Sequence, residues 1–414
     1  MMHLPARLFC RVFQTCFHLA LPILPYHEPE KLDSIDALPA RLRARGIGSV
    51  LLVTDPGLRA GGHTDALEAA LTAAGIRVTV YDGTSANPTV DNVEAARALY
   101  LENRCEGLVA MGGGSSIDCA KAVGARIVHP TRSLDQLKGL LRVYHKLPPL
   151  AAIPTTAGTG SEVTITAVIT DRAARHKYTM NNFTMIPAYA VLDPRVTESL
   201  PPSLTATTGM DALTHLVEAY IGRSTSRETR QLCRDAIALI FRYLERAYRD
   251  GGDLEAREGM LTAAYKAGIA FSKSYVGYIH AVAHSLGGQY NIPHGLANAV
   301  LMPVVLEAYG DTAHRKLAEL AVAAGIAAED ELPSVVAQRL IDEIRAMNRR
   351  MGIPTGFSQI REVDIPTMAR HAAREANPLY PVPKLMDAGE LEGFYRAVMA
   401  KGAPAEQRMP TAAS

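Results

Sequence analysis

Three closely spaced histidines are the residues of this sequence with the clearest chemistry. They are His280, His284 and His294, within the segment Tyr278–Val300. The first two are four residues apart, so on a helix they share one face. The third follows Pro293, a residue type that favours the start of a helix. Upstream, GMDALTHLVEAY adds an aspartate and a histidine, also four residues apart, at Asp211 and His215.

These residue types favour a transition metal. Imidazole nitrogens with a carboxylate oxygen suit Zn²⁺ or Fe²⁺, whereas Mg²⁺ and Ca²⁺ prefer shells made only of oxygen. A ligand histidine must be neutral, and the positive end of a helix dipole near His294 disfavours the charged ring. The spacing predicts a buried site for a single metal ion. The alternative is that each histidine is an ordinary core or surface residue. The rest of the chain has to decide between these two interpretations.

The bulk composition limits the classes of function. A chain of 414 residues exceeds the usual size of a single core, so we expect two domains. The net charge is +1 and no long run of one sign occurs, which argues against a nucleic-acid partner. The 5 cysteines are odd in number and include no C-x-x-C pair. They favour reduced thiols in a cytoplasmic protein over a disulfide framework.

Residues 1–30 form an atypical apolar N-terminal segment. In the run Leu8–Leu24 the only full charge is Arg11, and Gln14 and His18 interrupt the apolar residues. The run lacks the cleavage site of a secretory signal and is short for a membrane span. We predict an amphipathic helix that packs on the protein or on another subunit. Contact with a membrane surface is the second interpretation, and no transmembrane span is expected.

Strands alternate with helices in the first half of the chain and give way to helices in the second. The strands are expected at Ser49–Asp55, Arg77–Tyr81, Gly107–Met111, Pro149–Pro154 and Tyr189–Leu192. Helix breaks are expected at Gly251-Gly252, Gly287-Gly288, Gly325 and Gly352–Pro354. The pattern predicts an α/β domain over 1–200, with a parallel Rossmann-like sheet. An all-helical domain follows over 201–414, with the active site in the cleft between the two domains.

A glycine-rich loop follows the third of these strands, in Gly112–Val123 (GGGSSIDCAKAV). Glycines let a ligand approach the backbone, Ser115 or Ser116 can cap the helix, and free N–H groups favour a phosphate. The loop is not a Walker loop, and Ile117 occupies the last glycine position of the G-x-G-x-x-G pattern. An anion cradle and a tight turn are equally good interpretations of this loop alone.

Two other regions favour a dinucleotide. Asp55 follows an early strand, where its carboxylate can bind ribose hydroxyls and repel an added 2′-phosphate, or can simply cap a helix. A second loop at a strand end, Ile153–Glu162, carries the hydroxyls of Thr155, Thr156, Thr159 and Ser161. Lys177 offers a positive charge, although a single lysine is more often a solvated surface residue.

At this point the chain resembles the iron-containing (group III) alcohol dehydrogenases, which have the dehydroquinate-synthase-like fold. The matching motifs are GGGSSIDCAKAV, IPTTAGTGSEVT, ATTGMDALTHLVEAY and HAVAHSLGGQYNIPHGLANAVLMP, in the family's order, within about Ser49 to Asn377. The resemblance implies hydride transfer between an alcohol or aldehyde and NAD, or NADP, with Fe²⁺ or Zn²⁺. We also expect a homodimer or a larger homo-oligomer in the cytoplasm.

The resemblance also implies roles for individual residues. The metal ligands would be Asp211, His215, His280 and His294, and His284 would be the catalytic histidine near the reacting carbon. The dinucleotide contacts would be Asp55, Asn87, Gly113, Gly114, Ser115, Asp118, Thr155, Thr156, Thr159, Thr164 and Lys177. In the substrate pocket, Phe271 would line the wall. Tyr275, where a small residue is common, would narrow the pocket or add a hydroxyl.

Two other functions fit a chain of this kind. One is a non-redox lyase or synthase on the same fold, in which the dinucleotide only cycles during the reaction. The other is a catalytically silent binding protein. Net formation of NADH from simple alcohols would exclude the first, and metal analysis with a cofactor titration would decide the second. Within the main interpretation, the sequence limits the substrate only to a small or medium alcohol–aldehyde pair.

Overall fold

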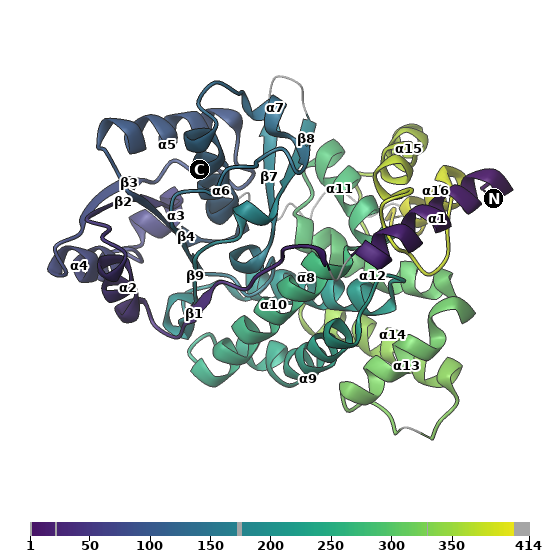
Figure 1. Cartoon of the computed structure of the whole chain (residues 1–414). Helices are drawn as coiled ribbons and strands as arrows, with labels where there is room; N and C mark the ends of the chain where they lie inside the picture. The colour runs from purple at the N-terminus through teal and green to yellow at the C-terminus, as the bar shows by residue number, and fades with distance from the viewer. Residues whose placement is uncertain (1, 21–22, 172–175, 329, 401–414) are drawn as a thin grey trace.

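The computed structural model describes residues 2–20, 23–171, 176–328 and 330–400, and it has two parts that lie side by side (Figure 1). One part combines a parallel sheet with helices, and the other consists of helices. The predicted fold class is confirmed. The end of the predicted helical domain, 401–414, lies outside the described residues.

Six parallel strands form the main sheet, in the order β1-β9-β6-β4-β2-β3. Their bounds are β1 (Glu30–Leu32), β2 (Ser49–Val53), β3 (Arg77–Tyr81), β4 (Gly107–Gly112), β6 (Leu150–Pro154) and β9 (Tyr189–Val191). All five predicted strands occur, and β2, β4 and β6 are buried along their whole length. The edge strand β1 was not predicted, because three residues with two charges give no apolar pattern.

Helices cover both faces of this sheet. They are α2 (Leu38–Ala44), α3 (Pro56–Ala60), α4 (Asp65–Ala73), α5 (Val90–Glu102), α6 (Gly114–Val128) and α7 (Leu134–Leu137). Leu51 of β2 packs in one apolar cluster with α5 and α6, while Val50 packs in another with α2 and α4. Successive residues of one strand therefore point into two cores, as expected for a sheet covered on both faces.

A small second sheet, which the sequence did not predict, lies beside α6. It is formed by β5 (Gly139–Leu140), β7 (Thr166–Asp171) and β8 (His176–Asn181). Strand β8 pairs with β5 in parallel and with β7 antiparallel. Its position matters for the site because Lys177 belongs to β8.

The second part contains nine α-helices among the residues described between 202 and 397. They are α8 (Pro202–Ile221), α9 (Arg227–Arg249), α10 (Leu254–Ser274), α11 (Tyr278–Tyr290), α12 (His294–Tyr309), α13 (Asp311–Ala323), α14 (Pro333–Arg350), α15 (Ile365–Ala376) and α16 (Ala388–Ala397). One large apolar cluster joins them. Helix α8 is buried along almost its entire length from Thr205 onwards and forms the centre of this part.

One of the predicted helix breaks is wrong. Helix α11 continues through Gly287-Gly288 to Tyr290 and ends at Asn291, which has a left-handed backbone with φ 55°. A Cβ at Gly287 would lie 3.9 Å from the Lys177 ammonium nitrogen. That distance is an ordinary van der Waals contact, so a side chain would fit at Gly287, and the helix does not end at this glycine. The other predicted breaks coincide with helix ends.

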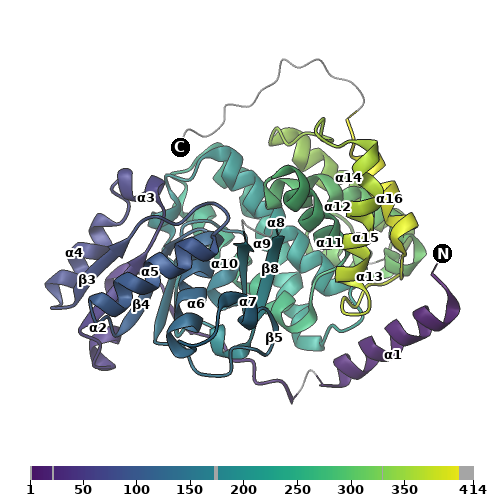
Figure 2. The same cartoon turned by 90° about the horizontal axis from the view of Figure 1, so that it is seen from above.

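The apolar N-terminal segment forms helix α1 (Leu4–Ala20), and residues 21–22 of the predicted run lie outside the described part. In both views α1 lies against the helical part, away from the sheet (Figures 1 and 2). Cys10 and Gln14 are buried there, whereas Leu8 and Phe9 on the outer side are exposed. None of the described helices is both long and apolar enough to cross a membrane.

The two parts touch closely at a pair of glycines. Gly160, in the loop after β6, has φ 61°, and a Cβ there would lie 2.6 Å from the Cα of Gly268 in α10. A Cβ at Gly268 would lie 2.6 Å from Cγ2 of Val163 in the same loop. No side chain fits between these backbones, so the contact fixes the loop against the helical part.

We expect Gly268→Ala to lower the free energy of unfolding by about 1–3 kcal/mol, because the added methyl group forces this contact apart. The matched control is Gly393→Ala in α16, where a Cβ would meet nothing within 4 Å. That variant should gain about 0.5–1 kcal/mol from its helix preference. Urea denaturation measures both. Equal stability of the two variants would contradict the close contact.

Candidate metal centre and dinucleotide loops

The four predicted metal ligands lie together inside the helical part. Asp211 and His215 come from α8, His280 from α11, and His294 is the first residue of α12. One ligand atom from each lies within 4.8 Å of all the others. Asp211 Oδ1 is 3.5 Å from His294 Nε2 and 4.0 Å from His280 Nε2. The group has the size of a shell around one ion.

The start of α12 is positioned by a close contact with α8. A helix does begin beside Pro293, as predicted; Pro293 is its N-cap residue, so His294 occupies the first turn. A Cβ at Gly295 would lie 2.4 Å from the carbonyl oxygen of Thr207. Because glycine has no Cβ, α12 can begin directly against α8, which brings His294 beside Asp211.

Burial keeps the three ligand histidines neutral. It lowers the pKa of His280 well below its usual value, lowers that of His294 to about 4, and lowers that of His215. Near neutral pH the rings therefore carry no charge, and each has a nitrogen lone pair to offer.

Glu218 of α8 fixes the orientation of His280. Its Oε2 lies 2.6 Å from His280 Nδ1, and its two oxygens also accept the N–H groups of Gly277 (2.7 Å) and Ile279 (2.8 Å). With Nδ1 engaged, Nε2 is directed towards Asp211, buried and without a hydrogen-bond partner among the described residues. An unpaired buried polar atom costs about 1–3 kcal/mol. This vacant nitrogen and the mixed nitrogen and oxygen donors fit Fe²⁺ or Zn²⁺.

Asn298 orients the carboxylate in the same way. Its Nδ2 donates to Asp211 Oδ1 at 2.6 Å and lies 3.2 Å from His294 Nε2. Neither supporting residue was predicted from the sequence, although the spacing of each carried a signal. Glu218 follows Asp211 by two helical turns, and Asn298 follows His294 by one, so each shares a helix face with a ligand.

His284 lies next to the cluster with a different partner. Its ring stacks on His294 with centroids 5.1 Å apart, and its Nδ1 is 2.6 Å from Oε1 of Glu375 in α15. The Tyr380 hydroxyl donates to the same oxygen at 2.7 Å. Burial lowers the pKa of His284, but the charge and hydrogen bond of Glu375 outweigh burial, so the net shift is upward. No local pattern could reveal Glu375, which is distant in the sequence.

The two residues predicted to line the substrate pocket lie at the end of α10. Phe271 stacks on His215, with centroids 4.2 Å apart and planes at 16°. Tyr275 follows one turn later, with φ 60° and ψ −176°. A residue other than glycine in this conformation carries strain of about 1–3 kcal/mol. The packing around Tyr275 must therefore hold it there.

The glycine-rich loop connects β4 to α6. The predicted serine cap is wrong, because Gly113 is the N-cap and no described side chain caps the helix. The Ser115 hydroxyl donates instead to the carbonyl of Ala86 at 2.6 Å. The Ser116 side chain packs against Gly112, where a Cβ would lie only 2.4 Å from its hydroxyl oxygen. The uncapped start of α6 suits an anion.

The threonine loop after β6 lies beside the glycine loop. The Thr155 N–H donates to the last carbonyl of β4 at 3.0 Å. The Thr156 side chain lies near Gly113, and a Cβ at Gly114 would be 2.9 Å from Thr159 Oγ1. The structure therefore brings these five predicted cofactor residues together at the carboxyl ends of two neighbouring strands, which is where parallel sheets bind ligands.

Two other predicted cofactor residues have partners within the protein. Asp118 accepts the Ser161 hydroxyl at 2.6 Å and the Val168 N–H at 2.9 Å. Thr164 is buried, and its hydroxyl oxygen accepts from the buried ammonium of Lys121 at 2.9 Å. Burial lowers the pKa of Lys121 to about 8. These bonds join α6 to the segment before β7, and a contact of either residue with the cofactor stays a prediction.

Asp55 has the structural role that the sequence left open. It is the N-cap of α3, and its Oδ1 accepts the N–H groups of Gly57 and Leu58, each at 3.0 Å. Because both bonds use the same oxygen, the carboxylate keeps a second oxygen for another partner. A contact with ribose stays a prediction.

Asn87 and Lys177 connect the two parts of the fold beside the histidines. Lys177 Nζ donates to Asn87 Oδ1 at 2.8 Å, and Asn87 Nδ2 donates to Asn291 Oδ1 at 3.2 Å. Burial lowers the pKa of Lys177. Its charge also lowers the pKa of His294, which burial lowers most. The predicted cofactor residues and the metal cluster therefore meet at this junction.

Family models match both parts of the chain. The model for iron-containing alcohol dehydrogenase covers residues 30–194, and the model for the C-terminal part of the Fe-containing alcohol dehydrogenase family covers residues 205–399. The chain belongs to the iron-containing alcohol dehydrogenase family. This confirms the resemblance found in the motifs and identifies a metal-dependent oxidoreductase that acts on alcohols.

Individual relatives match over nearly the same length. A 1,3-propanediol dehydrogenase of Klebsiella pneumoniae is 37% identical over 368 residues, 88% of this chain and 95% of that protein. A solved 1,3-propanediol oxidoreductase has a TM-score of 0.87 and 35% identity, covering 91% of this chain and 100% of its own. The sulfoacetaldehyde reductase of Bifidobacterium kashiwanohense, solved in complex with NAD⁺, has a TM-score of 0.81 and 29% identity, over 92% and 99% of the two chains.

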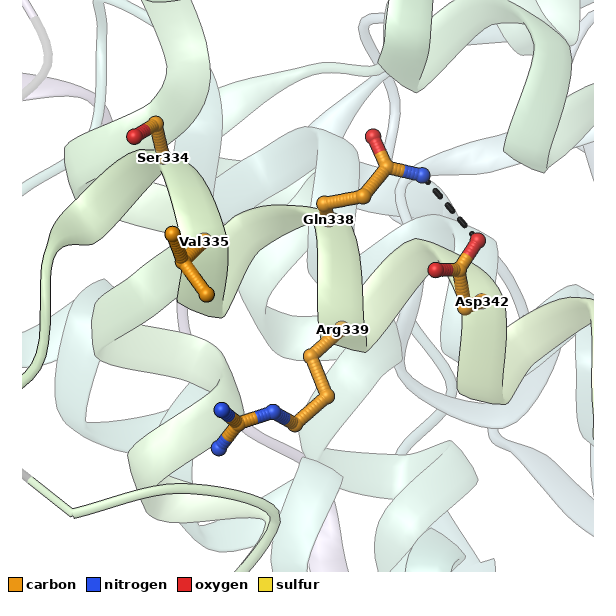
Figure 3. Close-up of a pocket in the computed structure, with 5 residues that line it drawn as sticks. All are labelled: Ser334, Val335, Gln338, Arg339 and Asp342. Carbon is orange, nitrogen blue, oxygen red and sulfur yellow. Dashed lines mark hydrogen bonds between the residues drawn. The ribbon is translucent and has the colours of Figure 1, made fainter.

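A hollow on the outer surface of this alcohol dehydrogenase lies along α14 and does not involve the cluster (Figure 3). Its lining residues are Ser334, Val335, Gln338, Arg339 and Asp342. Gln338 donates to Asp342 at 3.0 Å, and Arg339 pairs with Glu331 at 2.7 Å. Because Gln338 and Asp342 bind each other and Arg339 is paired with Glu331 outside the lining, the hollow offers no converging set of groups for a ligand.

We expect Glu218→Gln to lower metal affinity about 10–100-fold. The amide NH₂ of glutamine cannot accept all the hydrogen bonds by which Glu218 holds Gly277, Ile279 and His280. Elemental analysis after dialysis against graded chelator measures the affinity. The control is Glu319→Gln on α13, whose carboxylate accepts the Tyr220 hydroxyl at 2.6 Å. Unchanged metal retention in Glu218→Gln would contradict the orienting role.

Proposed function

We propose that this enzyme transfers hydride between a primary or secondary alcohol and NAD, with a metal ion held by Asp211, His215, His280 and His294. The observation that supports it most is the four ligand atoms within 4.8 Å of one another, three of them on neutral rings. The NAD⁺ complex of the sulfoacetaldehyde reductase supports the choice of cofactor. Fe²⁺ and Zn²⁺ both suit the donors, so the occupant depends on availability.

The protein's contribution at the metal is orientation and charge. When bound, the ion supplies Lewis acidity to the alcohol oxygen. Asp211 is the one carboxylate among the four, so the shell would neutralise only part of a divalent charge. Glu218 holds His280 by Nδ1, and Asn298 holds Asp211 by Oδ1, which limits the freedom of both ligands.

His284 is the proposed proton acceptor. Its Nδ1 is engaged by Glu375, so Nε2 is the nitrogen that can take up the hydroxyl proton of the alcohol. The negative charge of Glu375 stabilises the charged ring that results. A bound nicotinamide would supply the hydride acceptor, and His284 with Glu375 would take up the proton.

The dinucleotide would lie along the two loops at the strand ends. The uncapped start of α6 offers N–H groups for the pyrophosphate, beside Thr156 and Thr159. Lys177 and Asn87 would contact the end of the cofactor nearest the histidines. Asp55 would bind ribose hydroxyls with its second carboxylate oxygen and repel a 2′-phosphate, which favours NAD over NADP.

Three broader expectations belong to the same proposal. We infer domains over 1–200 and 201–414, supported by separate family models for 30–194 and 205–399. The free thiols of all five cysteines support a cytoplasmic location. Exposed Leu4, Leu8 and Phe9 on α1 support a homodimer or larger homo-oligomer, with membrane-surface contact as the competing outcome.

The proposed reaction is tested by a spectrophotometric screen of alcohols and aldehydes with NAD and NADP, after loading with Fe²⁺ or Zn²⁺. We expect net NADH formation from simple alcohols and its reversal by aldehydes. Turnover without net NADH would favour the non-redox lyase or synthase. Cofactor binding with no turnover of any substrate would favour a binding protein.

We expect His280→Ala to lose metal and turnover together, while the cofactor-binding part stays folded and still binds NAD. Elemental analysis, NADH formation and a cofactor titration measure the three properties. His314→Ala is the control, because this histidine lies on α13 and pairs with Asp311 of the same helix. An active His280→Ala enzyme without metal would contradict the metal assignment.

A further inference from the structure

Helix α1 is an addition outside the family-matched part of the chain, which begins at residue 30. Two polar residues on its inward side bind backbone carbonyls. Arg11 donates to the carbonyl oxygens of Val382 and Pro383, each at 2.8 Å. Gln14 donates to those of Tyr380 at 2.7 Å and Pro378 at 3.3 Å. Four bonds to one short stretch of backbone fix α1 to the segment between α15 and α16.

The same helix contacts Tyr275. The Phe17 ring meets the Tyr275 ring edge to face, with centroids 5.1 Å apart and planes at 77°. Tyr380 lies near the same ring, at 6.2 Å between centroids. A tyrosine in a backbone conformation that favours glycine needs such support, and α1 supplies it directly through Phe17 and indirectly through the Tyr380 segment.

Tyr275 and Tyr380, the two tyrosines that α1 supports, are both connected to residues of the reaction site. Phe271, one turn before Tyr275, stacks on His215 of the metal cluster. Tyr380 donates to Glu375, which holds His284. The rings of Tyr275 and Tyr380 therefore continue from these two groups outwards to α1. An alkyl chain that extends from the metal cluster past Phe271 would meet this aromatic wall.

We propose that α1 determines the size of alcohol that the enzyme accepts, because Phe17 holds Tyr275 across the outer end of the substrate site. This inference rests on the proposed alcohol dehydrogenase function. Phe17 acts through Tyr275 and is a specificity-determining residue, not a catalytic one. The two rings of the wall limit the space beyond Phe271, so the wild-type enzyme prefers short alcohols, and loss of the Phe17 ring admits longer chains.

The first test compares kcat/KM for 1-hexanol with kcat/KM for ethanol in the metal-loaded enzyme. In Phe17→Ala we expect this ratio to rise about tenfold or more, the size of effect that small changes in apolar pockets produce. Phe17→Leu, which keeps more of the packing, should give a smaller rise. The matched control is Phe13→Ala, one turn earlier on α1. The Phe13 side chain is exposed, and its ring lies near that of Phe9 on the same helix.

A second test needs no turnover. The chain contains no tryptophan, so Tyr275→Trp places its only tryptophan at the wall. We expect emission typical of a buried indole, and a shift to longer wavelength when Phe17→Ala is added, but not when Phe13→Ala is added.

The outcomes separate the inference from the function on which it rests. An active enzyme whose alcohol ratio is unchanged by Phe17→Ala overturns the inference and leaves α1 as a structural brace. Unchanged emission on loss of the Phe17 ring overturns the support of Tyr275 by α1. A wild-type enzyme that oxidises no alcohol with either metal contradicts the proposed function instead, and the fluorescence result is still measurable.

Discussion

The packing of three neutral imidazoles around one buried carboxylate is the interaction on which the rest of this structure depends. The buried polar atoms of Asp211, His215 and His280 are costly unless each has a partner. Glu218 and Asn298 satisfy one atom each of His280 and Asp211, and they leave the inward-facing nitrogen of His280 unpaired. Such a nitrogen is stable beside a metal and costly without one. The buried helix α8 carries two ligands and Glu218, so its packing fixes half of the site.

The two parts of the fold must be held in a fixed relative position, because each carries only some of the residues that the reaction needs. All four ligands come from the helical part, whereas the glycine and threonine loops come from the α/β part. Two of the contacts that hold the two parts together involve predicted site residues or their loops. Gly160 and Gly268 bring the threonine loop against α10, and hydrogen bonds run from Lys177 through Asn87 to Asn291. The first contact depends on two glycines, and the second depends on paired donors and acceptors.

The sequence predicted features that repeat at short range. Alternating strands and helices predicted the sheet. Spacings of four residues predicted the ligand pair of Asp211 and His215 and the shared helix face of His280 and His284. Predictions from the sequence failed where the role of a residue depends on contacts with a distant segment. Gly287-Gly288 looked like a helix break but lies inside α11, and the serine expected to cap α6 binds Ala86 instead. Glu375 and the support of Tyr275 by α1 arise only from tertiary packing. The roles of individual cofactor residues stay predictions.

The proposed chemistry requires a metal ion at one particular place. Diffraction from crystals of the Fe²⁺-loaded enzyme, measured on both sides of the iron absorption edge, locates that ion directly. We predict one anomalous peak per chain, at bonding distance from Asp211, His215, His280 and His294. An ion held by other residues would contradict the account, as would alcohol oxidation by a protein with no peak at this position.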